Sequence, residues 1–315
     1  MQKSKNIDVA IIGGGPAGIS AAIYTAYDGS VPMIFEAKTL AWIPELHINL
    51  LTKIEGFPGL INQINGTKLV DMYKQSLIEM NISENIVYEE IQTLVKRGTG
   101  FHLSTGKNQY IPRCVILCTG TTPKKLALAN EDKFSKTNLY YFAYKVAEGY
   151  ENKKVVVVGS RNSGSTAAKY LARLGAKVTI IEIKDRAQAK EKHTKHFAPL
   201  GINLVTSTQI ISLNGQTQLE SITIKHLDTN TSEDISLDAL FVYIGVDPNN
   251  KLALNLGVET DDMGFVKVNS KQETNIPGVL AAGDLCGNLK HVIAASGQGA
   301  TAAYNANKYL VSLKS

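Results

Sequence analysis

The clearest pattern along the chain is an apolar run, a glycine-rich turn, an alanine-rich stretch and a second apolar run, and it occurs twice. The first copy spans residues 8–36 and the second spans residues 154–182. Short apolar runs before and after a stretch of helical composition indicate a strand, a helix and a strand. An internal repeat of this kind predicts two βαβ units of the same build.

The spacing of the two copies is identical. Glu36 follows Gly13 by 36 − 13 = 23 positions, and Glu182 follows Gly159 by 182 − 159 = 23 positions. Each copy is followed by a further apolar run that ends in glycine and then proline, at residues 115–123 and 240–248. We interpret these two segments as crossovers between domains.

The resulting prediction is an α/β fold with two Rossmann-like, three-layer dinucleotide-binding domains, the second inserted into the first. The first domain comprises residues 1–118 and 246–315, and the second comprises residues 119–245. Periodicity is lost between residues 36 and 66, which predicts a long connection. The other expected elements are a helix at 67–80, short strands within 93–116 and 202–240, and a final helix at 293–313.

Composition narrows the class of protein. The 315 residues are 44% hydrophobic and 19% charged, enough for two ordinary cores. The net charge of +5 is spread without a basic block, so we expect no nucleic-acid partner. Apolar runs such as 7–12 are far shorter than the roughly 20 residues of a membrane span, and no signal-peptide region opens the chain. We therefore expect a cytoplasmic protein without a membrane span.

The first glycine turn has the residues that a dinucleotide pyrophosphate requires. Gly13 permits a tight turn, Gly15 allows the backbone to approach the phosphates, and Gly18 lets the helix lie close to the strand. The start of the helix offers unpaired N–H groups, and Glu36 can accept hydrogen bonds from a ribose hydroxyl. The candidate residues of this site are Gly13, Gly14, Gly15, Pro16, Ala17, Gly18 and Glu36.

Several motifs together resemble those of the thioredoxin-reductase-like flavoproteins over essentially the whole chain. They are residues 13–18, Gly56-Phe-Pro-Gly59, Thr119-Gly120, residues 140–142, Ala282-Gly-Asp284 and Ala295-Ser-Gly297. The resemblance implies that the first domain binds FAD, with Gly120, Gly283 and Asp284 at the site and Asp284 on the ribityl chain. It also implies a homodimer. A turn-capping role for Asp284 is the alternative.

The dithiol of thioredoxin reductases is missing. These enzymes carry Cys-x-x-Cys shortly before the second glycine turn, where this chain has Phe142-Ala-Tyr-Lys145. The three cysteines, Cys114, Cys118 and Cys286, form no Cys-x-x-Cys pair. Disulfide exchange needs a thiolate, so no protein dithiol is expected to relay electrons.

A branch without the dithiol includes the thioredoxin-reductase-like ferredoxin:NADP reductases, and four stretches resemble it: residues 40–46, 138–142, 283–286 and 293–297. In that branch an aromatic side chain near a Pro-Glu pair stacks on the flavin, and Trp42 or Ile43 falls at that point here. Ordinary packing of Trp42 is the alternative. The Gly-Gly-Gln motif of that branch is missing, and we expect no counterpart of its C-terminal extension.

The second glycine turn is less complete. Its candidate residues are Gly159, Ser160, Arg161, Asn162, Ser163 and Glu182. Arg161 stands where the backbone should approach the pyrophosphate, although a guanidinium can also pair with phosphate. The string resembles a variant in bacillithiol-disulfide-reductase-like flavoproteins, which implies NADH or NADPH binding. Glu182 favours a free ribose 2′-OH, Lys184 and Arg186 could meet a 2′-phosphate, and loss of the donor site is the alternative.

The remaining candidates lie near the C-terminus. Cys286 follows Asp284 by two residues and could lie at the flavin, or it is a small buried hydrophobic residue. The resemblance places the backbone of Val292 and Ile293 at the flavin pyrimidine, and His291 precedes them. Besides the flavin itself, Cys286 and His291 are the candidate catalytic residues.

These observations favour an FAD-dependent oxidoreductase in which NAD(P)H reduces the flavin and the flavin reduces an external acceptor. Ferredoxin, flavodoxin, a quinone and a free flavin are the candidate acceptors. One alternative is a reductase of low-molecular-weight disulfides that uses Cys286 or thiols of its substrate. The other is a flavin-binding sensor or partner-binding protein without nicotinamide turnover.

Overall fold

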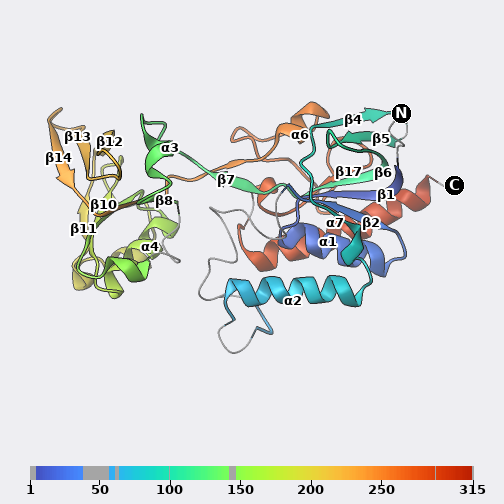
Figure 1. The fold of residues 1–315 in the computed structure, drawn as a ribbon, viewed down its shortest axis with the longest axis horizontal. Helices are drawn as coiled ribbons and strands as arrows, with labels where there is room; N and C mark the ends of the chain where they lie inside the picture. The colour runs from blue at the N-terminus through green and yellow to red at the C-terminus, as the bar shows by residue number, and fades with distance from the viewer. Residues whose placement is uncertain are drawn as a thin grey trace. The chain divides into compact units, whose positions relative to one another are not determined.

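The structure is a computed structural model that describes residues 5–37, 57–60, 64–98, 100–141, 147–287 and 289–313. The chain divides into two compact units. Unit 1 comprises Met1–Thr122 and Asp247–Ser315, and unit 2 is the intervening Pro123–Val246. Figure 1 shows the elements of each unit.

Unit 1 is built on a seven-stranded sheet in the order β3-β2-β1-β6-β5-β4, with β17 also paired to β6. Strands β1, β2, β3, β6 and β17 run parallel, whereas β4 and β5 are antiparallel additions. The strands are β1 (Lys5–Ile12), β2 (Pro32–Phe35), β3 (Ile86–Val87), β4 (Thr93–Arg97), β5 (Gly100–Ser104), β6 (Gln109–Leu117) and β17 (Val279–Ala281).

Alternating side chains of β1 build two cores, one on each face of this sheet. Val9 and Ile11 pack with residues of the helices α1 (Pro16–Tyr27), α2 (Gly66–Glu79) and α7 (Val292–Ser312). Ala10 and Ile12 pack on the opposite face with β4, β5 and α6 (Lys251–Asn255). Figure 1 shows α1 and α7 beneath the sheet, with α2 beyond α1. The result is a layered α/β domain.

Unit 2 has a five-stranded parallel sheet in the order β11-β10-β9-β15-β8. A separate antiparallel sheet contains β12, β13 and β14. The elements are β8 (Leu139–Tyr140), β9 (Lys154–Val158), β10 (Lys177–Ile181), β11 (Asn203–Val205), β12 (Thr208–Asn214), β13 (Ser221–His226), β14 (Ser232–Ser236), β15 (Ala239–Val242), α3 (Glu131–Phe134), α4 (Asn162–Arg173) and α5 (Glu191–Thr194).

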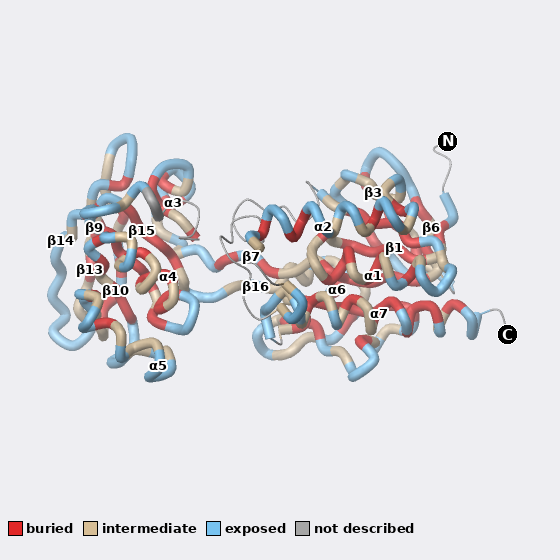
Figure 2. The backbone as a smooth tube through the Cα atoms, turned by 90° about the horizontal axis from the view of Figure 1, so that it is seen from below, coloured by how far each residue is buried: buried red, intermediate tan, exposed pale blue. Residues whose placement is uncertain are grey.

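Burial in unit 2 follows this organisation. β9 and β15 are central and buried apart from the first residue of β9, whereas β14 is an edge strand with four of its five residues exposed (Figure 2). A near-continuous apolar sequence such as Val155–Val158 is typical of a parallel strand covered on both faces. Helix α4 packs on one side of the sheet and β12 and β13 contribute to the core on the other.

The two crossover segments are themselves paired. β7 (Thr121–Pro123) and β16 (Val246–Pro248) form a two-stranded sheet. The Asn249 N–H donates to the carbonyl of Gly120 (3.0 Å), and the Thr119 hydroxyl donates to the carbonyl of Asn249 (2.8 Å). The two segments that connect the units therefore run side by side.

The structure confirms the predicted α/β fold class. The predicted helices at 67–80 and 293–313 correspond to α2 and α7 within one residue at each end. In the part of the chain that the structure describes, no helix has both the length and the apolar character that crossing a bilayer requires. Most of the predicted long connection between residues 36 and 66 lies outside the described residues.

Candidate functional site

The first glycine turn lies between β1 and α1 at the carboxyl end of the parallel strands. Gly13 has φ +108°, and a Cβ built there would lie 2.2 Å from the carbonyl oxygen of Cys118. A Cβ on Gly18 would lie 1.8 Å from the carbonyl oxygen of Gly13. Only glycine fits at either position, so both are required for the turn and for close packing of helix on strand.

Gly15 differs from these two because no contact among the described residues requires a glycine there. It is the N-cap of α1 with φ −77° and ψ −174°, which any residue can adopt, and a Cβ there would meet no atom within 4 Å. Pro16 follows as the first helical residue, where its missing N–H costs nothing. The open space before the unpaired N–H groups of α1 fits a pyrophosphate.

Glu36 follows β2 and closes the other side of the turn. Its Oε2 accepts the Gly14 N–H at 2.8 Å. This bond holds the carboxylate beside the glycine backbone, where an adenosine ribose would lie next to a pyrophosphate bound at the turn. The structure therefore brings Glu36 next to the glycine turn at Gly13–Gly18, the set of residues in which the sequence predicts a dinucleotide site.

The Asp284 segment reaches the same turn from a distant part of the chain. A Cβ on Gly283 (φ +80°) would lie 2.9 Å from the Cβ of Ala17, and the Gly283 N–H donates to Gln298 Oε1 at 2.8 Å. Gly299 of α7 lies against Ala17 as well, because a Cβ there would be 2.0 Å from the Ala17 carbonyl oxygen. These contacts place Asp284 next to the start of α1.

Asp284 has a carboxylate without a hydrogen-bond donor among the described residues. Burial raises the pKa of this carboxyl, and the electrostatic effects of Lys290 and His291 offset the rise only in part. A largely desolvated acid without a donor is costly unless a ligand supplies one. Ribityl hydroxyls of a bound flavin are suitable donors, so this residue fits the group that the sequence resemblance assigns to it.

The raised pKa of Asp284 leads to a testable pH dependence in FAD-free protein. Because the folded state holds this proton more tightly than the unfolded state, the free energy of unfolding should fall as pH rises from the ordinary Asp pKa of about 3.9 through the raised value. Asp284→Asn should lack this component. Thermal unfolding of both proteins across this pH range measures it, and equal pH profiles would contradict it. Adding FAD should reduce the difference between them.

The first turn of α7 supplies further backbone donors. His291 is the N-cap, is exposed, and makes no side-chain capping bond. The first intrahelical bond runs from the Ala295 N–H to the His291 carbonyl, so the N–H groups of Val292, Ile293 and Ala294 have no partner in the helix. Val292 is half-buried and Ile293 is 38% exposed. The helix thus offers three aligned N–H groups.

All three cysteines are buried and unpaired. Burial raises the pKa of Cys114 and of Cys286 to about 12, and it raises the pKa of Cys118 further still. The charge of Asp284 adds to the shift at Cys286. Reactive cysteines have a lowered pKa and are accessible. The three thiols therefore have the environment of unreactive cysteines that pack in a protein core.

The second glycine turn reproduces the backbone of the first. Gly159 has φ +93°, and the N-cap Arg161 has φ −67° and ψ 178°. A Cβ on Gly164 would lie 2.0 Å from the Gly159 carbonyl oxygen, just as Gly18 lies against Gly13. Arg161, Asn162 and Ser163 are exposed at the start of α4. Helix α4 therefore offers backbone N–H groups as α1 does. The Arg161 side chain stands at the N-cap position that Gly15 leaves open in the first turn.

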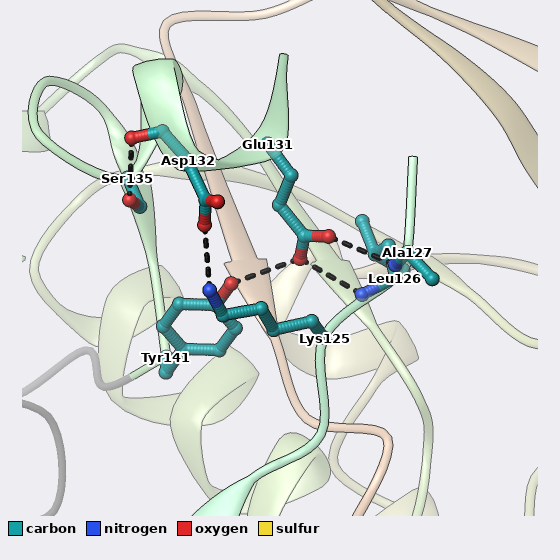
Figure 3. A network of polar contacts seen from close by, with 7 residues as sticks. All are labelled: Lys125, Leu126, Ala127, Glu131, Asp132, Ser135 and Tyr141. Carbon is teal, nitrogen blue, oxygen red and sulfur yellow. Dashed lines mark hydrogen bonds and ion pairs between the residues drawn. The ribbon is translucent and has the colours of Figure 1, made fainter. Parts of the chain in front are cut away.

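Two sets of predicted residues lie outside the described part of the chain: Trp42 and Ile43, and the segment 142–145 that stands where relatives carry the dithiol. A contact that sequence reasoning missed lies immediately before this segment. Glu131, buried in α3, accepts the N–H groups of Leu126 and Ala127 and the hydroxyl of Tyr141, each at 2.8 Å (Figure 3). Glu131 therefore links the segment after β7 to the residue that follows β8.

Gln298 was also missed as a partner of the Gly283 backbone. The one signal for it in the sequence is a polar residue in the glycine- and alanine-rich start of the last helix. Gly120, a predicted site residue, has φ +64°, and a Cβ there would meet nothing within 4 Å. It lies at the crossover beside Asn249.

Comparison with known proteins gives consistent results. The thioredoxin reductase of Treponema pallidum is 29% identical over 309 residues, covering 98% of each chain. The ferredoxin-NADP reductase 2 of Bacillus cytotoxicus is 31% identical over 324 residues, covering 98% of this chain and 95% of the relative. The crystal structure of Lactococcus lactis thioredoxin reductase (FR conformation) superimposes with a TM-score of 0.85 at 28% identity, covering 97% of this chain and 99% of that one.

A family model described as pyridine nucleotide-disulphide oxidoreductase matches residues 7–299. Thioredoxin-reductase-like members of this family bind FAD and NADPH. The matched residues include both glycine turns, their acids and the Asp284 segment. The chain belongs to the pyridine nucleotide-disulphide oxidoreductase family.

Proposed function

We propose that this protein is an FAD-dependent oxidoreductase that passes electrons from NAD(P)H to an external carrier such as ferredoxin or flavodoxin, without a protein dithiol. The observation that supports this proposal is the first glycine turn with Glu36 and the Asp284 segment beside it, in a chain whose three thiols are buried with raised pKa values. The likeness to a protein named ferredoxin-NADP reductase 2 supports the choice of acceptor.

Unit 1 would hold FAD. The N–H groups at the start of α1 would bind its pyrophosphate, Glu36 its adenosine ribose and Asp284 its ribityl hydroxyls. When bound, FAD accepts a hydride from NAD(P)H and releases electrons one at a time. The N–H groups of Val292, Ile293 and Ala294 are suited to stabilise negative charge on the reduced flavin.

Unit 2 would bind the electron donor at the start of α4. Its N–H groups and the exposed Arg161 guanidinium are suited to a pyrophosphate. The balance is one NAD(P)H oxidised to NAD(P)⁺ with release of one proton, and two one-electron carriers reduced. We further propose that the protein acts as a homodimer, which equilibrium sedimentation can test.

The test is anaerobic reduction of the purified yellow protein, followed by absorbance. We expect NADH or NADPH to bleach the flavin band, and oxidised ferredoxin or flavodoxin to restore it. Bleaching without reoxidation by either carrier would contradict the proposed acceptor. Absence of bleaching by both donors would contradict the proposed activity and favour a flavin-binding sensor.

A further inference from the structure

The second glycine turn differs from the first in one side chain that touches the acid. In the first turn, the Gly14 N–H donates to Glu36 Oε2 at 2.8 Å. In the second, Ser160 stands at the equivalent position and donates twice to Glu182 Oε2: from its N–H at 2.9 Å and from its hydroxyl at 2.5 Å. Ser160 is completely buried.

The other carboxylate oxygen of Glu182 is also engaged. Oε1 accepts the N–H of Lys184 at 3.0 Å. A carboxylate has about four acceptor positions, and three of those on Glu182 are occupied by its own chain. The side chain is 5% exposed, whereas Glu36 is half-buried. Little of Glu182 remains to accept hydrogen bonds from a ribose.

Ser160 also fixes the loop that follows β10. Its Oγ accepts the Gln188 N–H at 2.8 Å, so one hydroxyl links the glycine turn, the acid and the far end of this loop. Lys184, Asp185 and Arg186 between these anchors are exposed. The loop therefore lies against the turn with two cations and one anion at its surface.

We propose that Ser160 is a specificity-determining residue of the donor site. Its hydroxyl holds the Glu182 carboxylate and the loop, so that Glu182 does not select a free ribose 2′-OH. Donors with and without a 2′-phosphate are then accepted alike. The inference rests on the proposed function, since it concerns the same donor site in unit 2.

This reverses the expectation drawn from Glu182 in the sequence. An acid at the end of this strand should bind a ribose 2′-OH and repel a 2′-phosphate. A buried carboxylate that already accepts three hydrogen bonds from its own chain has little capacity left for the ligand. Lys184 and Arg186 on the loop would offset the remaining repulsion of a 2′-phosphate.

The test compares binding of 5′-AMP and 2′,5′-ADP to the FAD-loaded protein by calorimetry. We expect wild-type dissociation constants within about threefold of one another. Ser160→Gly recreates the Gly14 arrangement and frees an acceptor on Glu182, so it should favour 5′-AMP by about tenfold, equivalent to about 1.4 kcal/mol. Ser160→Ala should shift the ratio in the same direction and serves if the glycine variant folds poorly.

Ser165→Ala is the matched control. The Ser165 hydroxyl is buried in the same turn and donates to the Ser160 carbonyl at 2.8 Å and not to Glu182. Its removal should leave the ratio of the two affinities unchanged even if both weaken. In steady-state assays, Ser160→Ala should raise kcat/KM for NADH relative to kcat/KM for NADPH, compared with the wild-type ratio.

A wild type that prefers 5′-AMP by more than tenfold, or Ser160 variants with the wild-type ratio, would overturn the inference. So would failure of both nucleotides to bind. If the ratio is unchanged while NAD(P)H still reduces the flavin, only the role of Ser160 is rejected. If neither donor reduces the flavin, the proposed function fails as well.

Discussion

Gly15→Val is expected to yield a folded, colourless protein. The valine side chain would occupy the space before the α1 N-terminus, where a Cβ meets no atom of the described residues within 4 Å. The extended backbone at this residue accepts valine without strain. Affinity for FAD should fall at least 100-fold, equivalent to about 2.8 kcal/mol.

The ratio of flavin absorbance to protein, before and after incubation with excess FAD, measures this loss. Gly149→Val is the matched control, since a Cβ there also meets nothing within 4 Å among the described residues and the residue lies in unit 2, ahead of β9 and outside the first glycine turn. It should retain about one FAD per chain, as wild type should. Full occupancy in Gly15→Val would show that the pyrophosphate does not approach this residue.

The second large effect is the absence of thioredoxin reduction. With NADPH and thioredoxin we expect no turnover above background, against the 1–10³ s⁻¹ typical of enzymes. The sequence has no Cys-x-x-Cys pair, and a thiol with a pKa of about 12 is ionised to about one part in 10⁵ at pH 7. The thiolate that disulfide exchange requires is therefore essentially absent.

Cys286→Ser provides the control for this prediction. It should keep NAD(P)H-driven reduction of a dye acceptor within about twofold of wild type, because no step of the proposed reaction uses the thiol. Enzyme-like turnover of thioredoxin by wild type would refute the prediction. Reduction of a low-molecular-weight disulfide that is lost only in Cys286→Ser would favour the alternative thiol mechanism.

The sequence predicts the contacts at the first glycine turn better than those at the second. At the first turn, the contacts of Gly18 and Glu36 are made within one βαβ unit, whose order of strand, turn, helix and acid is visible in the sequence, whereas Gly13 lies against Cys118 beyond that unit. At the second turn the same spacing predicted the same backbone. The consequence of Ser160 was missed, because it depends on the path of the loop to Gln188.

The sequence by itself determined the two βαβ units, the glycines of both turns and the absence of a Cys-x-x-Cys pair, because these are properties of local spacing and residue type. Only the tertiary structure decided which side chains meet across long separations. The Gln298 contact with Gly283 and the contact of the Gln188 N–H with the Ser160 hydroxyl each need two segments brought together by packing. Burial likewise sets the raised pKa values of Asp284 and the cysteines, since desolvation depends on every neighbouring segment and not on the residue alone.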